Sequence, residues 1–198
     1  APAGTADGGG ETWGRGSRFV YAPLSDGRIY WYATANTPPG RVVDAHAHAD
    51  VVRRFAAWHD PIPALLAATP ADAVLHNDVY DLPLPLAPFA SGRVALLGDA
   101  AHAMTPNLGR GACAAIENAA ALTRLLGAYD EIATALTSYD AERLRPTATL
   151  IRRSRLVGAV GQLDNRFALA LRDTALRAAS ALAGRRAAGE DSRADAGH

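Results

Sequence analysis

The sequence predicts an α+β fold, with short strands toward the start of the chain and helices filling its second half. Three observations support this prediction. Asp26-Gly27 separates two strand-like apolar runs, which is a strong signal for a β-hairpin. A short apolar run, Arg93–Leu97, leads into a loop that contains proline and two glycines. From Ala112 onward apolar residues recur at helical spacing, so the order is strands first and helices later, without regular βαβ alternation.

The first half of the chain is predicted to build an antiparallel sheet. Residues 1–16 are Gly-rich and lack periodicity, which predicts a flexible entry. The elements expected next are strands over Arg18–Leu24 and Arg28–Thr34, helices over Val42–Trp58 and Ile62–Ala68, and a strand-like segment over Ala73–Leu82. Aromatic residues, among them Trp31 and Tyr32, lie on both faces of the second strand. Such a strand either walls a pocket for an apolar ligand or packs as an ordinary amphipathic sheet.

The second half is predicted to be mainly helical. Arg93–Leu97 is wholly apolar after its first residue, which favours a strand buried on both faces. The helices expected after it cover Ala112–Leu126 with Gly127 as C-cap, Glu131–Arg143, Pro146 to about Gln162, and Arg166–Leu182. Residues 184–198 have little apolar surface to bury and are predicted to form a disordered tail.

Composition excludes several classes of function. Of the 198 residues 49% are hydrophobic, which is enough for a core, while 20 basic and 20 acidic residues cancel. No basic block stands out, so no nucleic-acid partner is expected. No apolar run reaches the roughly 20 residues of a membrane span, and a single cysteine, Cys113, fits a reducing, cytoplasmic location. His46 and His48 would face different sides of a helix, so no metal site is expected.

The loop after the buried strand carries the chemistry. Gly98-Asp99 would stand at the carboxyl end of that strand, where ligands commonly bind in open sheets. An ionised Asp99 is an acceptor only and suits a ligand hydroxyl. Pro106 stiffens the loop, and Gly109 and Gly111 let the backbone approach a ligand closely. The helix that follows offers free N–H groups and a partial positive charge, so the loop predicts a polyhydroxylated ligand with an electron-rich group.

A dinucleotide fingerprint overlaps this loop without fitting it. Gly109-x-Gly111-x-x-Ala114 matches the pattern G-x-G-x-x-A, but that pattern must follow its strand directly. Here about a dozen residues intervene after Leu97, so the start of a Rossmann unit is disfavoured.

The run "RVALLGDAAHAMTPNLGRGACAAIENAAAL" resembles the second FAD-binding motif of group A flavin-dependent monooxygenases. This family includes the 4-hydroxybenzoate and salicylate hydroxylases and zeaxanthin-epoxidase-like proteins. Weaker similarity covers "FVYAPLSDGRIYWYAT" and "YDAERLRPTATLIRRSRLVG". The resemblance implies the C-terminal part of such an enzyme, with the N-terminal Rossmann unit absent. Its segments would be a partial substrate domain (17–90), an FAD-binding segment (91–128) and C-terminal helices (129–183).

The resemblance also implies roles for single residues. The implied cofactor-binding residues are Gly98, Asp99, Pro106, Gly109, Arg110, Gly111 and Ala112. Asp99 would bond the ribityl chain, the loop would lie along the isoalloxazine, and backbone N–H groups near Gly111 would face its pyrimidine end. Arg110 replaces the glutamine usual in the motif, and Asn118 replaces an aspartate and is expected only to touch the helix surface. Trp31 and Tyr32 would line the substrate, no catalytic acid or base is implied, and His102 is expected to shape the loop through hydrogen bonds.

The implied reaction uses FAD, NAD(P)H and O2 to hydroxylate or epoxidise an aromatic or unsaturated small molecule through a flavin C4a-hydroperoxide. A homodimer is one way in which such a chain could complete its flavin site. Two alternatives stay open. In the first, the chain is a non-catalytic ligand- or partner-binding remnant of a truncated flavoprotein gene. In the second, it belongs to an FAD-dependent reductase with the same motif.

Overall fold

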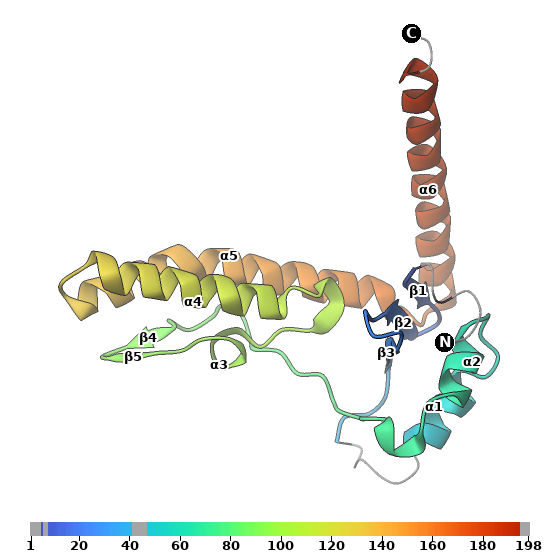
Figure 1. Cartoon of the computed structure of the whole chain (residues 1–198), viewed down its shortest axis with the longest axis horizontal. Coiled ribbons are helices and arrows are strands. Elements are labelled where there is room, and N and C mark those ends of the chain that lie inside the picture. The colour runs from blue at the N-terminus through green and yellow to red at the C-terminus, as the bar shows by residue number, and fades with distance from the viewer. Residues whose placement is uncertain (1–4, 6–7, 41–46, 195–198) are drawn as a thin grey trace. The chain divides into compact units, whose positions relative to one another are not determined.

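The computed structural model describes residues 5, 8–40 and 47–194, with side chains described up to residue 180. The chain divides into two compact units. One comprises residues 1–6 and 37–159, and the other comprises residues 7–36 and 160–198. Both helices and small antiparallel sheets are present (Figure 1), so the predicted α+β class is confirmed.

The second unit contains a three-stranded antiparallel sheet in the order β1 (Gly10–Trp13), β2 (Ser17–Pro23), β3 (Ile29–Ala35). The predicted hairpin is confirmed, with the Arg28 N–H donating to the Asp26 carboxylate at 3.1 Å. The expectation that residues 1–16 are flexible throughout is wrong, because β1 pairs with β2 from Gly10 opposite Tyr21 onward. A Cβ at Gly10 would lie 2.7 Å from the Tyr21 ring. The glycine that suggested flexibility therefore makes room for a tyrosine.

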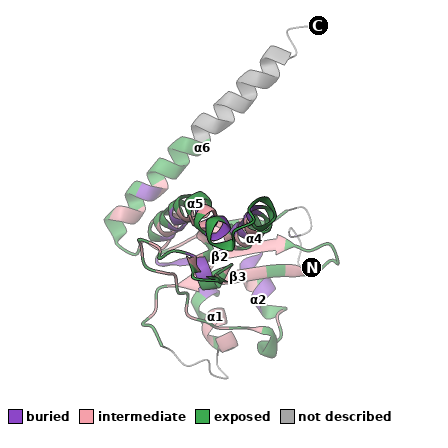
Figure 2. Ribbon diagram, turned by 90° about the vertical axis from the view of Figure 1, so that its left-hand side faces the viewer, coloured by how far each residue is buried: buried purple, intermediate pink, exposed green. Residues whose placement is uncertain are grey.

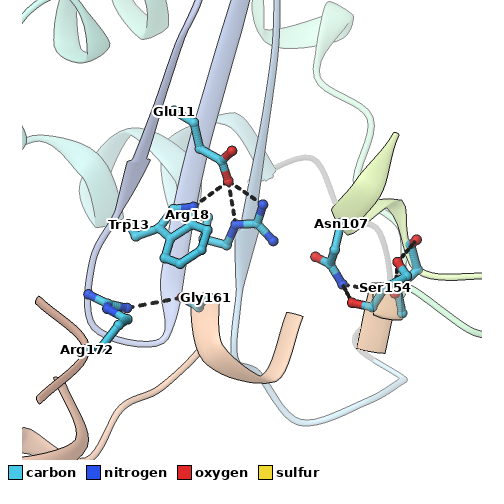
Figure 3. Close-up of polar contacts among 8 residues, drawn as sticks. Glu11, Trp13, Arg18, Asn107, Ser154, Gly161 and Arg172 are labelled. Atoms are coloured by element: carbon cyan, nitrogen blue, oxygen red, sulfur yellow. Dashed lines mark hydrogen bonds and ion pairs between the residues drawn. The ribbon is translucent and has the colours of Figure 1, made fainter. Parts of the chain in front are cut away.

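A buried arginine anchors this sheet to the helices of the same unit. Arg18 is 1% exposed, and its Nε donates to the Glu11 carboxylate at 2.9 Å. The Trp13 ring lies 5.3 Å from the Arg18 guanidinium and 5.7 Å from that of Arg172 (Figure 3). A Cβ at Gly161 would lie 2.8 Å from Arg18 Cδ, so the glycine admits the arginine side chain.

Helix α6 (Arg166–Ala194) begins after Asn165, whose side chain accepts from the Phe167 N–H at 2.9 Å. This is the expected arrangement of an N-capping residue. The helix continues to Ala194, so the prediction of disorder from residue 184 is wrong for all but residues 195–198, which lie outside the described residues. Alanine and arginine, frequent in this stretch, are among the strongest helix formers. No helix in the described part of the chain is long and apolar enough to cross a membrane.

Two long helices form the body of the first unit. These are α4 (Gly111–Ala128) and α5 (Ile132–Gly161, whose last two residues belong to the other unit). They run antiparallel in Figure 1, and both views show them side by side (Figures 1 and 2). The core between them and the preceding loop consists of Phe89, Ala101, Ala121, Leu125, Ala135 and Tyr139.

Both predicted helix boundaries in this region are wrong. Gly127 lies inside α4, whose C-cap is Tyr129. The two helices expected on either side of Pro146 form one continuous helix. Proline removes one helical N–H, but Thr147 and Ile151, just beyond it, are 2% and 0% exposed. The packing of these two buried side chains keeps the helix continuous across Pro146.

The remaining helices of this unit are short. They are α1 (Ala47–Phe55) and α2 (Ile62–Ala67); the buried Phe55 ring lies 4.7 Å from the Trp58 ring in the connection between them. Residues 42–46 of the helix expected over Val42–Trp58 lie outside the described residues, and the helix ends three residues early. Helix α2 is confirmed to within one residue.

The strand expected over Ala73–Leu82 is wrong. A 3-10 turn, η1 (Ala71–Ala73), opens the segment, and the rest is irregular. Instead of a strand ladder, Arg155 of α5 holds the segment, with its Nε 2.5 Å from the Asp81 carboxylate. The Leu82 N–H donates to the Ala103 carbonyl at 3.0 Å. Together with an Arg155 bond to the Leu82 carbonyl, this satisfies both backbone groups of Leu82 without a neighbouring strand.

The strand expected to be buried over Arg93–Leu97 is short and exposed. Strands β4 (Ala90–Ser91) and β5 (Val94–Ala95) form only a two-stranded ribbon. Val94 is 63% exposed and Leu96 is 40% exposed, because no described element covers this side of the ribbon. A strand is therefore confirmed only at Val94–Ala95, and the prediction that it is buried on both faces is wrong. Helix α3 (Asp99–His102) and the 3-10 turn η2 (Pro106–Leu108) complete the unit.

Candidate functional site

The turn from β5 into α3 presents a carboxylate to solvent. Gly98 has φ +58° and ψ −142°, a conformation that is essentially restricted to glycine. Its carbonyl accepts from the N–H groups of Ala101 at 3.0 Å and His102 at 2.9 Å. Asp99 follows at the first position of α3, exposed, and its side chain makes no hydrogen bond with a described residue. The turn thus holds an ionisable acceptor ready for an external donor.

The loop between α3 and α4 ends on an uncapped helix. Pro106 opens η2, and Gly109 has φ +61° and ψ +21°, the left-handed region, so the chain can reverse into α4. Arg110 occupies the N-cap position but gives no side-chain hydrogen bond to the helix start. Within the described residues, the first N–H groups of α4, at Gly111 and Ala112, therefore have no side-chain cap. Such groups attract an anion or an electron-rich atom.

The carboxylate and the helix start belong to the same small region. A Cβ at Gly98 would lie 3.7 Å from the Ala115 Cβ, in the second turn of α4. A Cβ at Gly109 would meet nothing within 4 Å, and one at Gly111 would approach only Met104, at 3.8 Å. The structure thus brings Gly98, Asp99 and the start of α4 together and leaves open space at Gly109.

Arg110 is held in an ion-pair chain along α4. Its guanidinium lies 2.9 Å from Glu117, whose other oxygen lies 2.8 Å from Arg143 of α5. The bonded Arg143 guanidinium holds the pKa of the Glu117 carboxyl below its usual range. Arg143 Nε also donates to Asn118 Oδ1 at 2.6 Å. Asn118 is 0% exposed, so the expectation that it touches only the helix surface is wrong.

His102 is packed and does not act through hydrogen bonds. It is 0% exposed, and neither ring nitrogen has a partner among the described residues. Its ring centroid lies 6.1 Å from that of Phe89. Burial lowers the pKa of the imidazole. The expectation that His102 shapes the loop through hydrogen bonds is wrong, since its ring fills the core beneath α3.

The predicted substrate residues lie in the other unit and on opposite faces of its sheet. Neighbouring residues of a strand alternate in direction. Trp31 stacks on the buried Phe19, with centroids 5.3 Å apart. Tyr32 is opposite Val20, on the face that also carries Arg18, and burial raises the pKa of its hydroxyl. One face of this sheet can therefore offer a ligand only one of the two side chains.

Sequence reasoning missed the residues that support the loop from below. Thr105 and Asn107 meet Ser154 of α5 through three hydrogen bonds of 2.7–3.0 Å, and a fourth, of 2.9 Å, joins Asn107 to Thr105 (Figure 3). The only signal in the sequence was Gly158, a glycine inside a predicted helix. Glycine in that place costs about 0.5–1 kcal/mol relative to alanine, which indicates a packing reason.

The hydrogen-bond acceptors and donors of this loop fit a flavin nucleotide. A carboxylate acceptor suits the hydroxyls of a sugar-like chain, and uncapped backbone N–H groups suit an electron-rich ring edge. Open space at Gly109, and at Gly111 a contact with the Met104 side chain alone, let a flat group approach the backbone. Within the described residues, no group of three or more metal-ligand side chains is present.

Comparison with known proteins agrees with this chemistry. A family described as "FAD binding domain" matches residues 15–154. Aurachin C monooxygenase/isomerase of Stigmatella aurantiaca is 41% identical over 167 residues, which are 84% of this chain and 43% of that protein. The chloroplastic zeaxanthin epoxidase of Nicotiana plumbaginifolia is 40% identical over 136 residues, 63% of this chain and 20% of that protein.

Solved structures show the same similarity. HpxO of Klebsiella pneumoniae, crystallised with FAD and uric acid, superposes with a TM-score of 0.74 and 32% identity. The superposition covers 82% of this chain and 43% of that one. The chain thus spans less than half the length of each of these relatives.

Proposed function

The chain belongs to the family of FAD-binding domains, and we propose that it forms one side of the flavin site of an FAD-dependent monooxygenase. The observation that supports this most directly is that an exposed carboxylate, Asp99, and a helix start without a side-chain cap, that of α4, lie on the same loop region. The related proteins are, by name, a monooxygenase/isomerase and an epoxidase, and HpxO binds FAD.

Each residue of the loop has a distinct role in this proposal. Asp99 accepts hydrogen bonds from the ribityl hydroxyls. Gly98 and Gly109 set the backbone turns on either side, and Pro106 stiffens the loop that lies along the ring. The N–H groups of Gly111 and Ala112 stabilise negative charge on the ring when it is reduced. Arg110, paired with Glu117, adds a partly neutralised cation at the same helix end.

FAD would supply redox chemistry, accepting electrons from NAD(P)H and using O2 to place one oxygen atom on the substrate. The protein's part is to hold the flavin, orient a small aromatic or unsaturated molecule and exclude water. Hydroxylation and epoxidation both fit this arrangement. We propose that either Trp31 or Tyr32 contacts the substrate. Because the two side chains lie on opposite faces of the sheet, only one of them can do so. A homodimer remains one proposed way to complete the site.

Asp99→Ala tests the assignment in the protein that carries this chain. Loss of a charge-assisted hydrogen bond costs about 1.5–3 kcal/mol, so FAD affinity should fall roughly tenfold to a hundredfold. The measurement is a fluorescence titration with FAD, followed by an assay of oxygen consumption and product. Asp130→Ala is the control, because Asp130 is an exposed aspartate at the far end of α4.

Unchanged FAD affinity together with unchanged turnover in Asp99→Ala would refute the proposal. If the unaltered protein binds no FAD and consumes no oxygen, the non-catalytic alternative is favoured instead. Flavin reduction coupled to saturation or desaturation of the substrate, without oxygen insertion, would indicate the reductase.

A further inference from the structure

Three side chains join the loop between α3 and α4 to helix α5 in a continuous hydrogen-bonded chain. Asn107 Nδ2 donates to Thr105 Oγ1 at 2.9 Å. Thr105 Oγ1 lies 2.8 Å from Ser154 Oγ, and Ser154 Oγ donates to the Thr105 carbonyl at 2.7 Å. Ser154 is 0% exposed.

The count of protons fixes the direction of this chain. A hydroxyl has one proton, and Ser154 gives its proton to the Thr105 carbonyl. The hydroxyl of Thr105 must then be the donor to Ser154 Oγ, while it accepts from Asn107. Every hydroxyl in the chain is used as both donor and acceptor. A buried polar network that is satisfied in this way holds its members in one arrangement.

The absence of a side chain at Gly158 leaves room for the Asn107 amide against α5. Asn107 Nδ2 also donates to the Ser154 carbonyl at 3.0 Å, which brings its amide against α5 one turn before Gly158. A Cβ at position 158 would lie 2.2 Å from Asn107 Nδ2 and 3.0 Å from its Cγ. With a Cβ at position 158, the Asn107 amide would have to rotate away from α5 and give up its hydrogen bond to the Ser154 carbonyl.

We propose that Thr105, Asn107, Ser154 and Gly158 form a clasp that fixes the loop from Thr105 to Gly111 on α5 before any ligand binds. Asn107 and Ser154 are in this view positioning residues, since they lie beneath the loop and act through its backbone. The role of the loop toward FAD rests on the proposed function. The clasp itself is a property of the ligand-free chain and can be tested without the cofactor.

Hydrogen exchange in the ligand-free chain is the first test. The reporter is the Gly109 N–H, which donates to the Pro106 carbonyl at 2.9 Å within the loop. Ser154→Ala removes one oxygen atom from the clasp and should speed exchange up to about tenfold, the equivalent of one hydrogen bond. Ser154→Thr keeps the hydroxyl and should restore protection. Thr137→Ala is the control, because the Thr137 hydroxyl bonds only the Ala133 carbonyl of its own helix.

The second test measures the bound flavin in the protein that carries this chain. Ser154→Ala should weaken FAD binding and shift the flavin reduction potential to a more negative value, because the N–H groups at Gly111 lose their fixed position. Thr137→Ala should change neither quantity. Gly158→Ala should act like Ser154→Ala, and Ser154→Ala decides alone if Gly158→Ala does not fold.

Unchanged exchange at Gly109 in Ser154→Ala would overturn the clasp. Faster exchange with unaltered FAD affinity and potential would overturn its positioning role. If the unaltered protein binds no FAD, the proposed function fails, and the exchange measurement still decides whether the clasp exists.

Discussion

Replacing Gly98 by alanine should destabilise the turn that presents Asp99. An added Cβ would lie 3.7 Å from the Ala115 Cβ, an ordinary contact, so the cost comes from the backbone and not from a clash. At φ +58° and ψ −142° an alanine is strained by about 1–3 kcal/mol. Gly127→Ala is the matched control, because Gly127 lies within α4 with nothing near its Cβ position. It should stabilise the same unit by about 0.5–1 kcal/mol.

The two alanine variants should therefore differ by roughly 1.5–4 kcal/mol, with opposite signs relative to the unaltered chain. Urea unfolding followed by circular dichroism measures this. With a slope of about 2 kcal/mol/M, the two midpoints should be separated by roughly 0.8–2 M. A Gly98→Ala midpoint at or above that of the unaltered chain would show that the backbone conformation assigned to Gly98 is wrong.

Two further predictions concern the polar groups around the loop. His102 has a folded-state pKa lowered by burial, so its contribution to stability is complete above about pH 6.5, the unfolded value, and is lost as the pH falls from there toward the folded-state pKa. His102→Phe should flatten this loss in urea midpoints between about pH 8 and pH 5, whereas His59→Phe, at an exposed site, should not. Asn118→Ala removes a buried acceptor from Arg143 and should cost about 1.5–3 kcal/mol. Glu117→Gln weakens a half-exposed pair and should cost about 0.2–1 kcal/mol, and the reverse order would contradict the burial argument.

The chemistry-bearing loop was predictable because its signals are local. A glycine before an aspartate, a stiffening proline and two glycines before an apolar helix each restrict the backbone within a few residues. The structure confirms the hairpin at Asp26-Gly27 and the helix after Arg110 for the same reason. The roles of the loop residues toward FAD stay predictions that the Asp99 experiment tests.

Several predictions that failed depended on distant partners. β1 forms because a glycine leaves room for the Tyr21 ring on the neighbouring strand. Pro146 does not end α5, because buried residues beyond it pack against the unit. The exposed β5 and the irregular segment before Leu82 show the converse, since a strand-like composition needs a neighbour to form a ladder.

The sequence by itself determined the order of the motif, the hairpin, the helical second half and the type of ligand that the loop suits, because these follow from backbone restrictions and side-chain chemistry within short windows. Only the tertiary structure decided that Asn118 is buried, that the His102 ring has no hydrogen-bond partner among the described residues, and that Ser154 meets a loop 47 residues earlier in the chain. Contacts of that kind depend on which face of α5 turns toward the loop. Packing of the whole unit sets that face, and no local pattern in the sequence records it.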